Sequence, residues 1–477
     1  MPSPPSDALL AALEARLGPR GFSRDPDLLA PWTTDWRGKY RGAAAALLSP
    51  GSTEEVAAIV AACAKEGTAL VPQGGNTSMV GGATPDADGT ALLLSLRRMN
   101  RVRSLSTQDN VMVAEAGAIL SDVHARAEEA GRRFPLSLAA KGSATIGGLV
   151  STNAGGTQVL RFGTMRSLVL GLEAVLPDGS VYEGLSALRK DNRGYDLRQL
   201  LVGAEGTLGV VTAASLRLVA APGSRGVAWA GLASPHDALR LLRFLEEQLG
   251  EAVESFELVP DNALALVLRH IPGARAPLAE THRWNVLVEA VAPSAGASAE
   301  EGLAAALGGA MEAGLVADAV LAGSEAQAQA LWGLRENVSE AERQEGPALK
   351  HDVSVAVSAM PAFMEEARRE VEARFPGARV IAFGHLGDGN VHYNVQPPVG
   401  ADGAAWLERE GKEVTALVYD LVTAAGGSIS AEHGIGQMKL AELERTASPV
   451  QRAAQLAIKR ALDPKGIMNP GKLFPRS

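Results

Sequence analysis

The sequence has a single cysteine, Cys63, in 477 residues. A disulfide framework requires pairs of cysteines, and CxxC redox or zinc motifs require two at short spacing, so both are excluded. A reducing compartment fits this count. Basic residues are also fewer than acidic ones. The formal net charge of −9 argues against a general nucleic-acid binder, because such a protein needs a basic surface.

Long apolar runs are missing as well, and none reaches the length of a transmembrane helix. The most apolar stretch, GLAAALGGAMEAGLVADAVLAG, is interrupted by Glu312, Asp318 and several glycines. The first residues, MPSPPSDALLAALEARLGPR, lack the basic start and long apolar core of a signal peptide. They are typical of an amphipathic helix from Asp7 to Leu17 with Ser6 as its N-cap. We therefore expect a cytoplasmic protein.

Two common nucleotide-binding motifs are absent. Neither GxGxxG nor GxxxxGK[ST] occurs, so a Rossmann NAD site and a P-loop are unsupported. Glycine nevertheless clusters between Gly74 and Gly209, in GGNTSMVGG, KGSATIGG, NAGG and GAEGTLG. The first cluster would let successive N–H groups converge on phosphate oxygens, and the others leave the backbone bare for a flat cofactor. One such cluster is usually a set of tight turns, but four in one domain favour a cofactor site.

The length allows two or three domains. Residues 1–221 alternate short β-like runs with helical patterns, and a boundary is indicated by the proline and glycines of AAPGSRG near Pro222. Residues 222–429 alternate helix and strand in an order that predicts an antiparallel sheet with helices on one face. Residues 430–477 are mostly helical. The fold class is therefore α+β.

The stretch GHLGDGNVHYNV holds two of the eight histidines. Asp-Gly is a strong signal for a two-residue hairpin turn. A turn centred on Asp388 and Gly389 places His385 opposite His392, with Cβ atoms about 4.5–5.5 Å apart. Both imidazoles would then leave the same face, either as ligands of one metal ion or as an ordinary polar pair. A metal site needs a third ligand from elsewhere.

Seven motifs occur in a fixed order: VPQGGNTSMVGG, AAKGSATIGGLVSTNAGG, RFGTMRSLVLGLEAVLPDG, KDNRGYDLRQLLVGAEGTLGVVT, GHLGDGNVHYNV, SAEHGIG and LDPKGIMNPGK. This set, from about Asp35 to Phe474, resembles the FAD-linked D-2-hydroxy-acid dehydrogenases of the vanillyl-alcohol-oxidase type, and is most like those that act on D-2-hydroxyglutarate. The resemblance implies a two-subdomain FAD-binding domain (1–221), an antiparallel-sheet substrate and metal domain (222–429), and a C-terminal segment (430–477) that completes the FAD and active site.

The resemblance also implies an FAD site. The loop Pro72, Gln73, Gly74, Gly75, Asn76 and Thr77 would hold the pyrophosphate. The residues that would line the pyrophosphate and the flavin are Pro135, Gly142, Ser143, Ile146, Gly147, Asn153, Ala154, Gly155 and Gly156. The adenosine side or the ring system would be contacted by Glu205, Gly209 and Val211, and Asn469 would reach the flavin. The first loop lacks the histidine through which some relatives attach the flavin, so we expect non-covalent FAD.

SAEHGIG supplies a candidate for the third metal ligand. Glu432 could complete a His385–His392–Glu432 site, the composition of catalytic zinc centres, and the resemblance assigns the same three residues. Manganese, cobalt or iron(II) would also accept them. Glu432 could otherwise be a helix-start or surface carboxylate. Next to it, His433 is the expected catalytic base, although it could be a fourth ligand or a core histidine.

The reaction would remove two hydrogens from H–C–OH, a hydride to flavin N5 and a proton from the hydroxyl. A metal at the hydroxyl and carboxylate acidifies that proton, and a base contributes roughly 10²–10⁴ in rate. Arg335 and Ser339 lie four residues apart in a predicted helix, so they face one way, and Lys350 begins a strand. The resemblance implies that these three bind the substrate carboxylate, with Asn394 and His433 also at the substrate. The ordinary alternative for Arg335 and Lys350 is a surface salt bridge.

We therefore expect an FAD- and metal-dependent dehydrogenase that oxidises a D-2-hydroxy acid, preferably D-2-hydroxyglutarate, to the 2-oxo acid. D-Lactate or D-malate dehydrogenase and the FAD subunit of a glycolate-oxidising complex are the alternative enzymes. A non-catalytic flavoprotein module is the alternative outside enzymes. The family implies an electron-transfer flavoprotein or a quinone as electron acceptor, and a homodimer.

Overall fold

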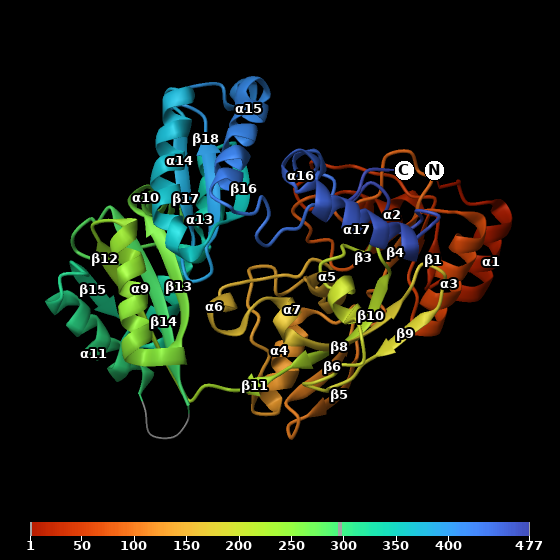
Figure 1. Cartoon of the computed structure of the whole chain (residues 1–477), viewed down its shortest axis with the longest axis horizontal. Coiled ribbons are helices and arrows are strands. Elements are labelled where there is room, and N and C mark those ends of the chain that lie inside the picture. The colour runs from red at the N-terminus through yellow and green to blue at the C-terminus, as the bar shows by residue number, and fades with distance from the viewer. Residues whose placement is uncertain (1, 294–297, 477) are drawn as a thin grey trace. The chain divides into compact units, whose positions relative to one another are not determined.

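The structure is a computed structural model that describes residues 2–293 and 298–476 (Figure 1). The chain forms two compact units. Unit 1 holds the chain up to Gly155, Gly163–Ala220 and the chain from Glu432 onward, and unit 2 holds Gly156–Phe162 and Ala221–Ala431. The helical C-terminal residues therefore belong to the same unit as the N-terminal part of the chain.

Unit 1 contains a four-stranded sheet in the order β1-β2-β4-β3, in which β2 and β3 both run parallel to β4. The predicted helix Asp7–Leu17 is confirmed as α1, with the hydroxyl of Ser6 accepting from the N–H of Leu9 at 3.1 Å. Apolar side chains of α1, α3 and this sheet share one core, which includes Cys63. The elements are α1 (Asp7–Leu17), β1 (Phe22–Ser23), α2 (Pro26–Thr33), β2 (Ala46–Leu48), α3 (Thr53–Glu66), β3 (Leu70–Gln73) and β4 (Leu92–Ser95).

A second sheet of unit 1 has five antiparallel strands in the order β5-β6-β10-β8-β9, and β11 pairs with β7 in a two-stranded ribbon. Two sheets of different strand direction agree with the two subdomains expected for this part of the chain. The elements are β5 (Val102–Ser106), β6 (Val111–Glu115), α4 (Leu120–Glu129), β7 (Arg132–Arg133), α5 (Ile146–Ser151), α7 (Met165–Leu168), β8 (Val169–Val175), β9 (Val181–Gly184), α8 (Leu197–Leu201), β10 (Val210–Arg217), β11 (Val219–Ala220), α16 (Leu440–Thr446) and α17 (Pro449–Leu462).

Unit 2 is built on a seven-stranded antiparallel sheet in the order β15-β12-β14-β13-β17-β18-β16. Its strands are β12 (Ser224–Leu232), β13 (Val253–Pro260), β14 (Trp284–Ala292), β15 (Asp318–Leu321), β16 (Leu349–Ser354), β17 (Arg379–His385) and β18 (Asn390–Gln396). Its helices are α6 (Val159–Phe162), α9 (Pro235–Leu249), η1 (Gly250–Ala252), α10 (Asp261–His270), α11 (Ala299–Glu312), α12 (Glu325–Glu336), α13 (Val338–Glu345), η2 (Val357–Ala359), α14 (Met360–Arg374) and α15 (Gly403–Ala424).

Helices cover both faces of this sheet, so the expectation of helices on one face is wrong. On one face α9, α11, α14 and α15 pack against the strands, and on the other lie α10, α12 and α13. The central strands explain the second layer, because β13 is buried along its whole length and β14 at all but one position. A strand that is buried on both sides needs cover on both sides. No helix in the described part of the chain is long and apolar enough to cross a membrane.

Candidate functional site

One face of the unit 2 sheet carries four of the side chains expected to bind metal and substrate, namely His385, His392, Lys350 and Asn394. The strand register pairs Glu257 with His385, Asp352 with His392, and Lys350 with Asn394. Register partners point to the same face of a sheet. This is the face that α10, α12 and α13 cover, because Phe383, two residues before His385, packs into their apolar core. We call it the polar face.

The hairpin that carries the two histidines differs from the expected one. His385 pairs with Asn390, and His392 pairs with Phe383, so the histidines are not directly opposite. A type I′ turn requires a positive φ at both central residues, but only Gly389, at +82°, has one. Residues 386–389 form a longer loop, in which the carboxylate of Asp388 accepts from the N–H of Asn390 at 2.9 Å. The histidines are diagonal neighbours, with ring centroids 5.4 Å apart.

Glu432 lies within reach of both imidazoles. The ligand atoms of His385, His392 and Glu432 are all within 4.8 Å of one another. Glu432 directly follows Ala431, whose N–H donates to the carbonyl of Asp352 on β16 at 3.4 Å. Asp352, Glu432 and His433 form a second group of the same compactness. Two imidazoles and a carboxylate suit a divalent metal, so the donor chemistry fits the expected ion.

Glu257, which the sequence reasoning missed, contacts two residues expected to be functional. Its side chain is buried, and its carboxylate accepts from Nδ1 of His385 at 2.6 Å and from Nε of Arg335 at 2.8 Å. Burial by itself raises the pKa of Glu257, but the charges of His385 and Arg335 outweigh it and lower the pKa to about 2. The signal was an acidic residue inside the apolar strand VESFELVP.

Arg335 and Ser339 do not lie on one continuous helix as expected. The helical path breaks at Asn337, which ends α12 and precedes α13 with φ −83° and ψ 2°. The side-chain amide of Asn337 donates to the carbonyl of Gly333 at 2.8 Å and so competes with the backbone pattern. Arg335 is buried and its guanidinium lies 4.8 Å above the ring of Phe383. It is not the surface salt bridge of the alternative interpretation.

Glu342, on α13, holds two further expected substrate residues. Its fully buried carboxylate accepts from the side-chain amide of Asn394 at 2.7 Å and lies 3.4 Å from Nζ of Lys350. Burial raises the pKa of Glu342, and the charge of Lys350 opposes that rise. Nζ of Lys350 also donates to the carbonyl of Ser339 at 3.4 Å. The structure thus brings Lys350, Asn394 and Ser339 together around a carboxylate that sequence reasoning did not name.

The first glycine cluster of unit 1 forms a tightly packed loop after β3. A Cβ placed on Gly75 would lie 1.8 Å from the carbonyl oxygen of Ser143, and one on Gly74 would lie 2.3 Å from Oγ1 of Thr145. Only glycine allows this approach. Asn76 has a left-handed φ of 55°, and its side-chain amide donates to the carbonyl of Thr34 at 2.9 Å. Two of the expected cofactor loops, Pro72–Thr77 and the one around Ser143, therefore touch each other.

Other expected cofactor residues meet at a second point in unit 1. Asn469 has φ 42°, and its amide donates to the carbonyl of Glu205 at 2.7 Å. The carboxylate of Glu205, with φ 52°, accepts from the N–H groups of Ile435 and Gly436 at 2.8 and 2.7 Å. Burial raises the pKa of Glu205 by more than these two hydrogen bonds lower it. Glu205 therefore binds its own chain through both carboxylate oxygens.

Known proteins resemble this chain along nearly its whole length. Residues 44–184 match the family described as "FAD binding domain", and residues 221–473 match "FAD linked oxidases, C-terminal domain". D-2-hydroxyglutarate dehydrogenase of Xanthomonas citri pv. viticola is 40% identical over 98% of this chain and 97% of its own length. The mitochondrial D-2-hydroxyglutarate dehydrogenase of Bos taurus is 40% identical over 98% of this chain and 83% of that protein.

The chain belongs to the D-2-hydroxyglutarate dehydrogenase family of FAD-linked oxidases. It is an FAD-dependent oxidoreductase, and the family resemblance seen in the motifs is confirmed. The structure of p-cresol methylhydroxylase with substrate bound superimposes with a TM-score of 0.74 at 16% identity, covering 98% of this chain and 97% of that one. This likeness confirms the vanillyl-alcohol-oxidase type fold.

Unit 1 of this dehydrogenase fits FAD by its unsatisfied polar atoms. Among the described residues, Oε1 of Gln73, Oγ1 of Thr145 and Oδ1 of Asn469 are buried without a hydrogen-bond partner. Each belongs to, or packs against, an expected cofactor loop, and buried polar atoms are rarely left unpaired in a complete structure. A cavity of about 420 Å³ also opens beside Gly75 and Asn76, lined by Trp32 and Trp36.

The remaining expected cofactor residues are spread along unit 1, with one exception. Gly209 and Val211 lie at the start of β10, where a Cβ on Gly209 would be 2.7 Å from the carbonyl oxygen of Val175. Gly156 falls in unit 2, while Gly155 falls in unit 1. The other expected residues in unit 1 are Pro135, Gly142, Ile146, Gly147, Asn153 and Ala154.

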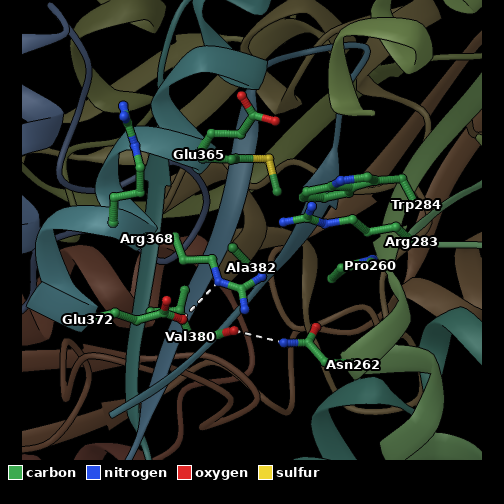
Figure 2. Close-up of a pocket in the computed structure, with 11 residues that line it drawn as sticks. Pro260, Asn262, Arg283, Trp284, Glu365, Arg368, Glu372, Val380 and Ala382 are labelled. Carbon is green, nitrogen blue, oxygen red and sulfur yellow. Dashed lines mark hydrogen bonds and ion pairs between the residues drawn. The ribbon is translucent and has the colours of Figure 1, made fainter. Parts of the chain in front are cut away.

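A cavity of about 440 Å³ in unit 2 contains none of the expected site residues (Figure 2). It includes Val380 and Ala382, whose side chains alternate with those of Ile381 and Phe383 and so leave the sheet on the face opposite the polar face. The cavity opens where β13 and β17 diverge after two register pairs. Asn262 bridges the gap by donating to the carbonyl of Val380 at 2.9 Å (Figure 2).

Proposed function

We propose that this protein oxidises D-2-hydroxyglutarate to its 2-oxo acid with FAD and a divalent metal ion, zinc being the first choice. The observation that carries the proposal is the grouping of His385, His392 and Glu432 within 4.8 Å. Relatives 40% identical over almost the whole chain are named D-2-hydroxyglutarate dehydrogenases, which supports this substrate over other 2-hydroxy acids.

Charge on the polar face supports a cation there. The two cationic side chains expected to bind substrate there are Arg335 and Lys350, and each is already paired with a buried carboxylate, Glu257 or Glu342. Asp352 adds a further buried carboxylate on the same face. An anionic substrate would meet at least as much negative as positive charge, and such a charge balance does not attract it. A divalent ion would reverse that balance and would acidify the substrate hydroxyl.

The side chains have separate tasks in this proposal. Glu257 engages only Nε of Arg335, which leaves the terminal Nη pair to grip a substrate carboxylate in the bidentate way. Lys350, Ser339 and Asn394 bind the substrate beside it. His433 accepts the hydroxyl proton as the carbon–hydrogen bond breaks. Bound FAD supplies the hydride acceptor, through flavin N5.

Anaerobic flavin reduction tests the function. Purified protein that carries FAD is mixed without oxygen with D-2-hydroxyglutarate, D-malate, D-lactate or glycolate, and the loss of oxidised-flavin absorbance is followed. D-2-hydroxyglutarate is expected to bleach the flavin fastest. Faster bleaching by D-lactate, D-malate or glycolate would favour the alternative dehydrogenases or a glycolate-oxidising subunit. Failure of all four would favour a non-catalytic flavoprotein module.

The proposal also covers the attachment of FAD, the electron acceptor, the compartment and the oligomeric state. We propose non-covalent FAD, because the loop Pro72–Thr77 contains no histidine. An electron-transfer flavoprotein or a quinone would reoxidise the flavin, and the protein would act as a cytoplasmic homodimer. Treatment with acid tests the first point, since non-covalent FAD should leave the precipitated protein and remain in solution.

A further inference from the structure

Glu257 occupies a position where a carboxylate is costly. It lies on β13, a strand buried along its whole length, and has no exposed surface. Removing a carboxylate from water costs several kcal/mol unless close partners compensate. The partners of Glu257 are His385 from β17 and Arg335 from α12, so one carboxylate joins three elements of unit 2.

The contact with His385 fixes which ring nitrogen is available to a metal. An ionised carboxylate only accepts hydrogen bonds, so Nδ1 of His385, 2.6 Å from Glu257, must carry the hydrogen. The lone pair of a neutral imidazole then lies on Nε2. A carboxylate behind a metal-binding histidine fixes the ring orientation and raises the basicity of the ligand.

The contact with Arg335 orients the guanidinium. Glu257 accepts from Nε at 2.8 Å, and the ring of Phe383 lies 4.8 Å from the guanidinium carbon. Held at one edge and on one face, the planar group keeps its terminal Nη pair in a fixed direction. A preoriented fork loses less conformational entropy when it binds a carboxylate.

We propose that Glu257 is a positioning residue. Through one carboxylate it aligns His385, which binds the metal, and Arg335, which binds the substrate carboxylate. The inference rests on the proposed function, since it assumes that these two residues bind metal and substrate. It assigns no direct contact between Glu257 and the metal ion or the substrate. Loss of its negative charge should therefore weaken metal binding and substrate binding together.

Glu257→Gln tests this inference, with Glu254→Gln as the matched control. His385 and Arg335 bond to different oxygens of Glu257, and a glutamine keeps an acceptor at only one of these two positions. Glu254 is a fully buried carboxylate on the same strand, with Arg161 at 3.0 Å and Gln158 at 2.8 Å as partners. Metal-free proteins are titrated with Mn²⁺, and binding is followed by the loss of the free-ion EPR signal, which does not depend on turnover. KM and kcat for D-2-hydroxyglutarate are then measured at saturating Mn²⁺.

Glu257→Gln is expected to weaken Mn²⁺ binding about 10- to 100-fold and to raise KM on the order of tenfold. Glu254→Gln should change neither. Glu257→Asp keeps the charge, should recover part of both losses, and provides the measurement if the glutamine variant does not fold. Wild-type Mn²⁺ affinity and KM in both Glu257 variants would overturn the inference and leave the proposed function intact. Failure of the wild-type protein to bind Mn²⁺ would overturn the proposed metal site, and with it the metal-positioning part of the inference.

Discussion

The imidazoles of His385 and His392 lie 5.4 Å apart between ring centroids, with their planes at 77°, although the two residues are not register partners. His385 pairs with Asn390, which is two residues from the partner expected for a two-residue turn. An even register shift keeps every side chain on its face, whereas a shift of one residue exchanges the faces. His385 and His392 therefore still point to the same face of the sheet, although the loop is longer than expected.

Glu432→Ala and His392→Ala should each lose bound metal and turnover while keeping FAD. Removing one of three ligands leaves an incomplete set for a divalent ion, and neither Glu432 nor His392 is among the residues expected to hold FAD. Metal content by elemental analysis and flavin absorbance measure the two effects. His236→Ala removes an imidazole that is half exposed on α9 and should change neither. Normal flavin reduction by Glu432→Ala would show that the metal assignment is wrong.

Arg335→Lys should raise KM for D-2-hydroxyglutarate on the order of tenfold, because the substitution costs a charged hydrogen bond. A lysine has one nitrogen, which cannot contact Glu257 and also present a two-pronged fork to the substrate. Arg343→Lys is the matched control, since Arg343 is exposed on α13 and pairs with Glu340 three residues away. Steady-state kinetics on both variants decide the point. An unchanged KM in Arg335→Lys would remove Arg335 from the substrate site.

The family and fold were readable from the sequence because they depend on local patterns. Position 75 requires glycine because a Cβ there would lie 1.8 Å from the carbonyl oxygen of Ser143, and this glycine is visible in the sequence motif. The strand pair around Asp388 was also visible, since turn residues lie between two apolar runs. Such features can be predicted because neighbours in the chain determine them.

Glu257 and Glu342 could not be assigned because their partners are distant in sequence. Glu257 lies 128 residues from His385, and Glu342 lies 52 residues from Asn394. Both are acidic residues in buried positions, which signals a partner but does not name it. The break at Asn337 was missed for a different reason, since a side-chain amide competing with the helix leaves a pattern that still reads as helical.

Gly75→Ala should reduce the amount of FAD that co-purifies with the protein. The added methyl group would meet the carbonyl oxygen of Ser143, a backbone atom that cannot rotate away, so the loop after β3 must shift. Gly308→Ala is the control, because beyond the backbone of its own helix and its chain neighbours nothing lies within 4 Å of the added Cβ on α11. The flavin-to-protein absorbance ratio measures the effect. FAD content equal to that of wild type in Gly75→Ala would argue against a cofactor role for this loop.

Glu345→Gln should lower the unfolding temperature at pH 7, and the difference from wild type should vanish in acid. Glu345 ends α13, and its carboxylate binds His270 at 2.7 Å and Arg379 at 2.8 Å, which lower its pKa from the ordinary 4.5 to about 2. A lowered carboxyl pKa stabilises the fold above the unfolded-state value, so this contribution is present above pH 4.5 and is lost as the pH falls towards 2. The partly exposed arginine limits the contribution to the order of 1 kcal/mol, or a shift of about 2–4 °C.

Glu340→Gln is the control, since its pair with Arg343 is exposed and solvent screens it. Thermal unfolding by circular dichroism from pH 2 to pH 7 tests both, and a difference for Glu345→Gln that persists undiminished at pH 2 would contradict an ionic origin.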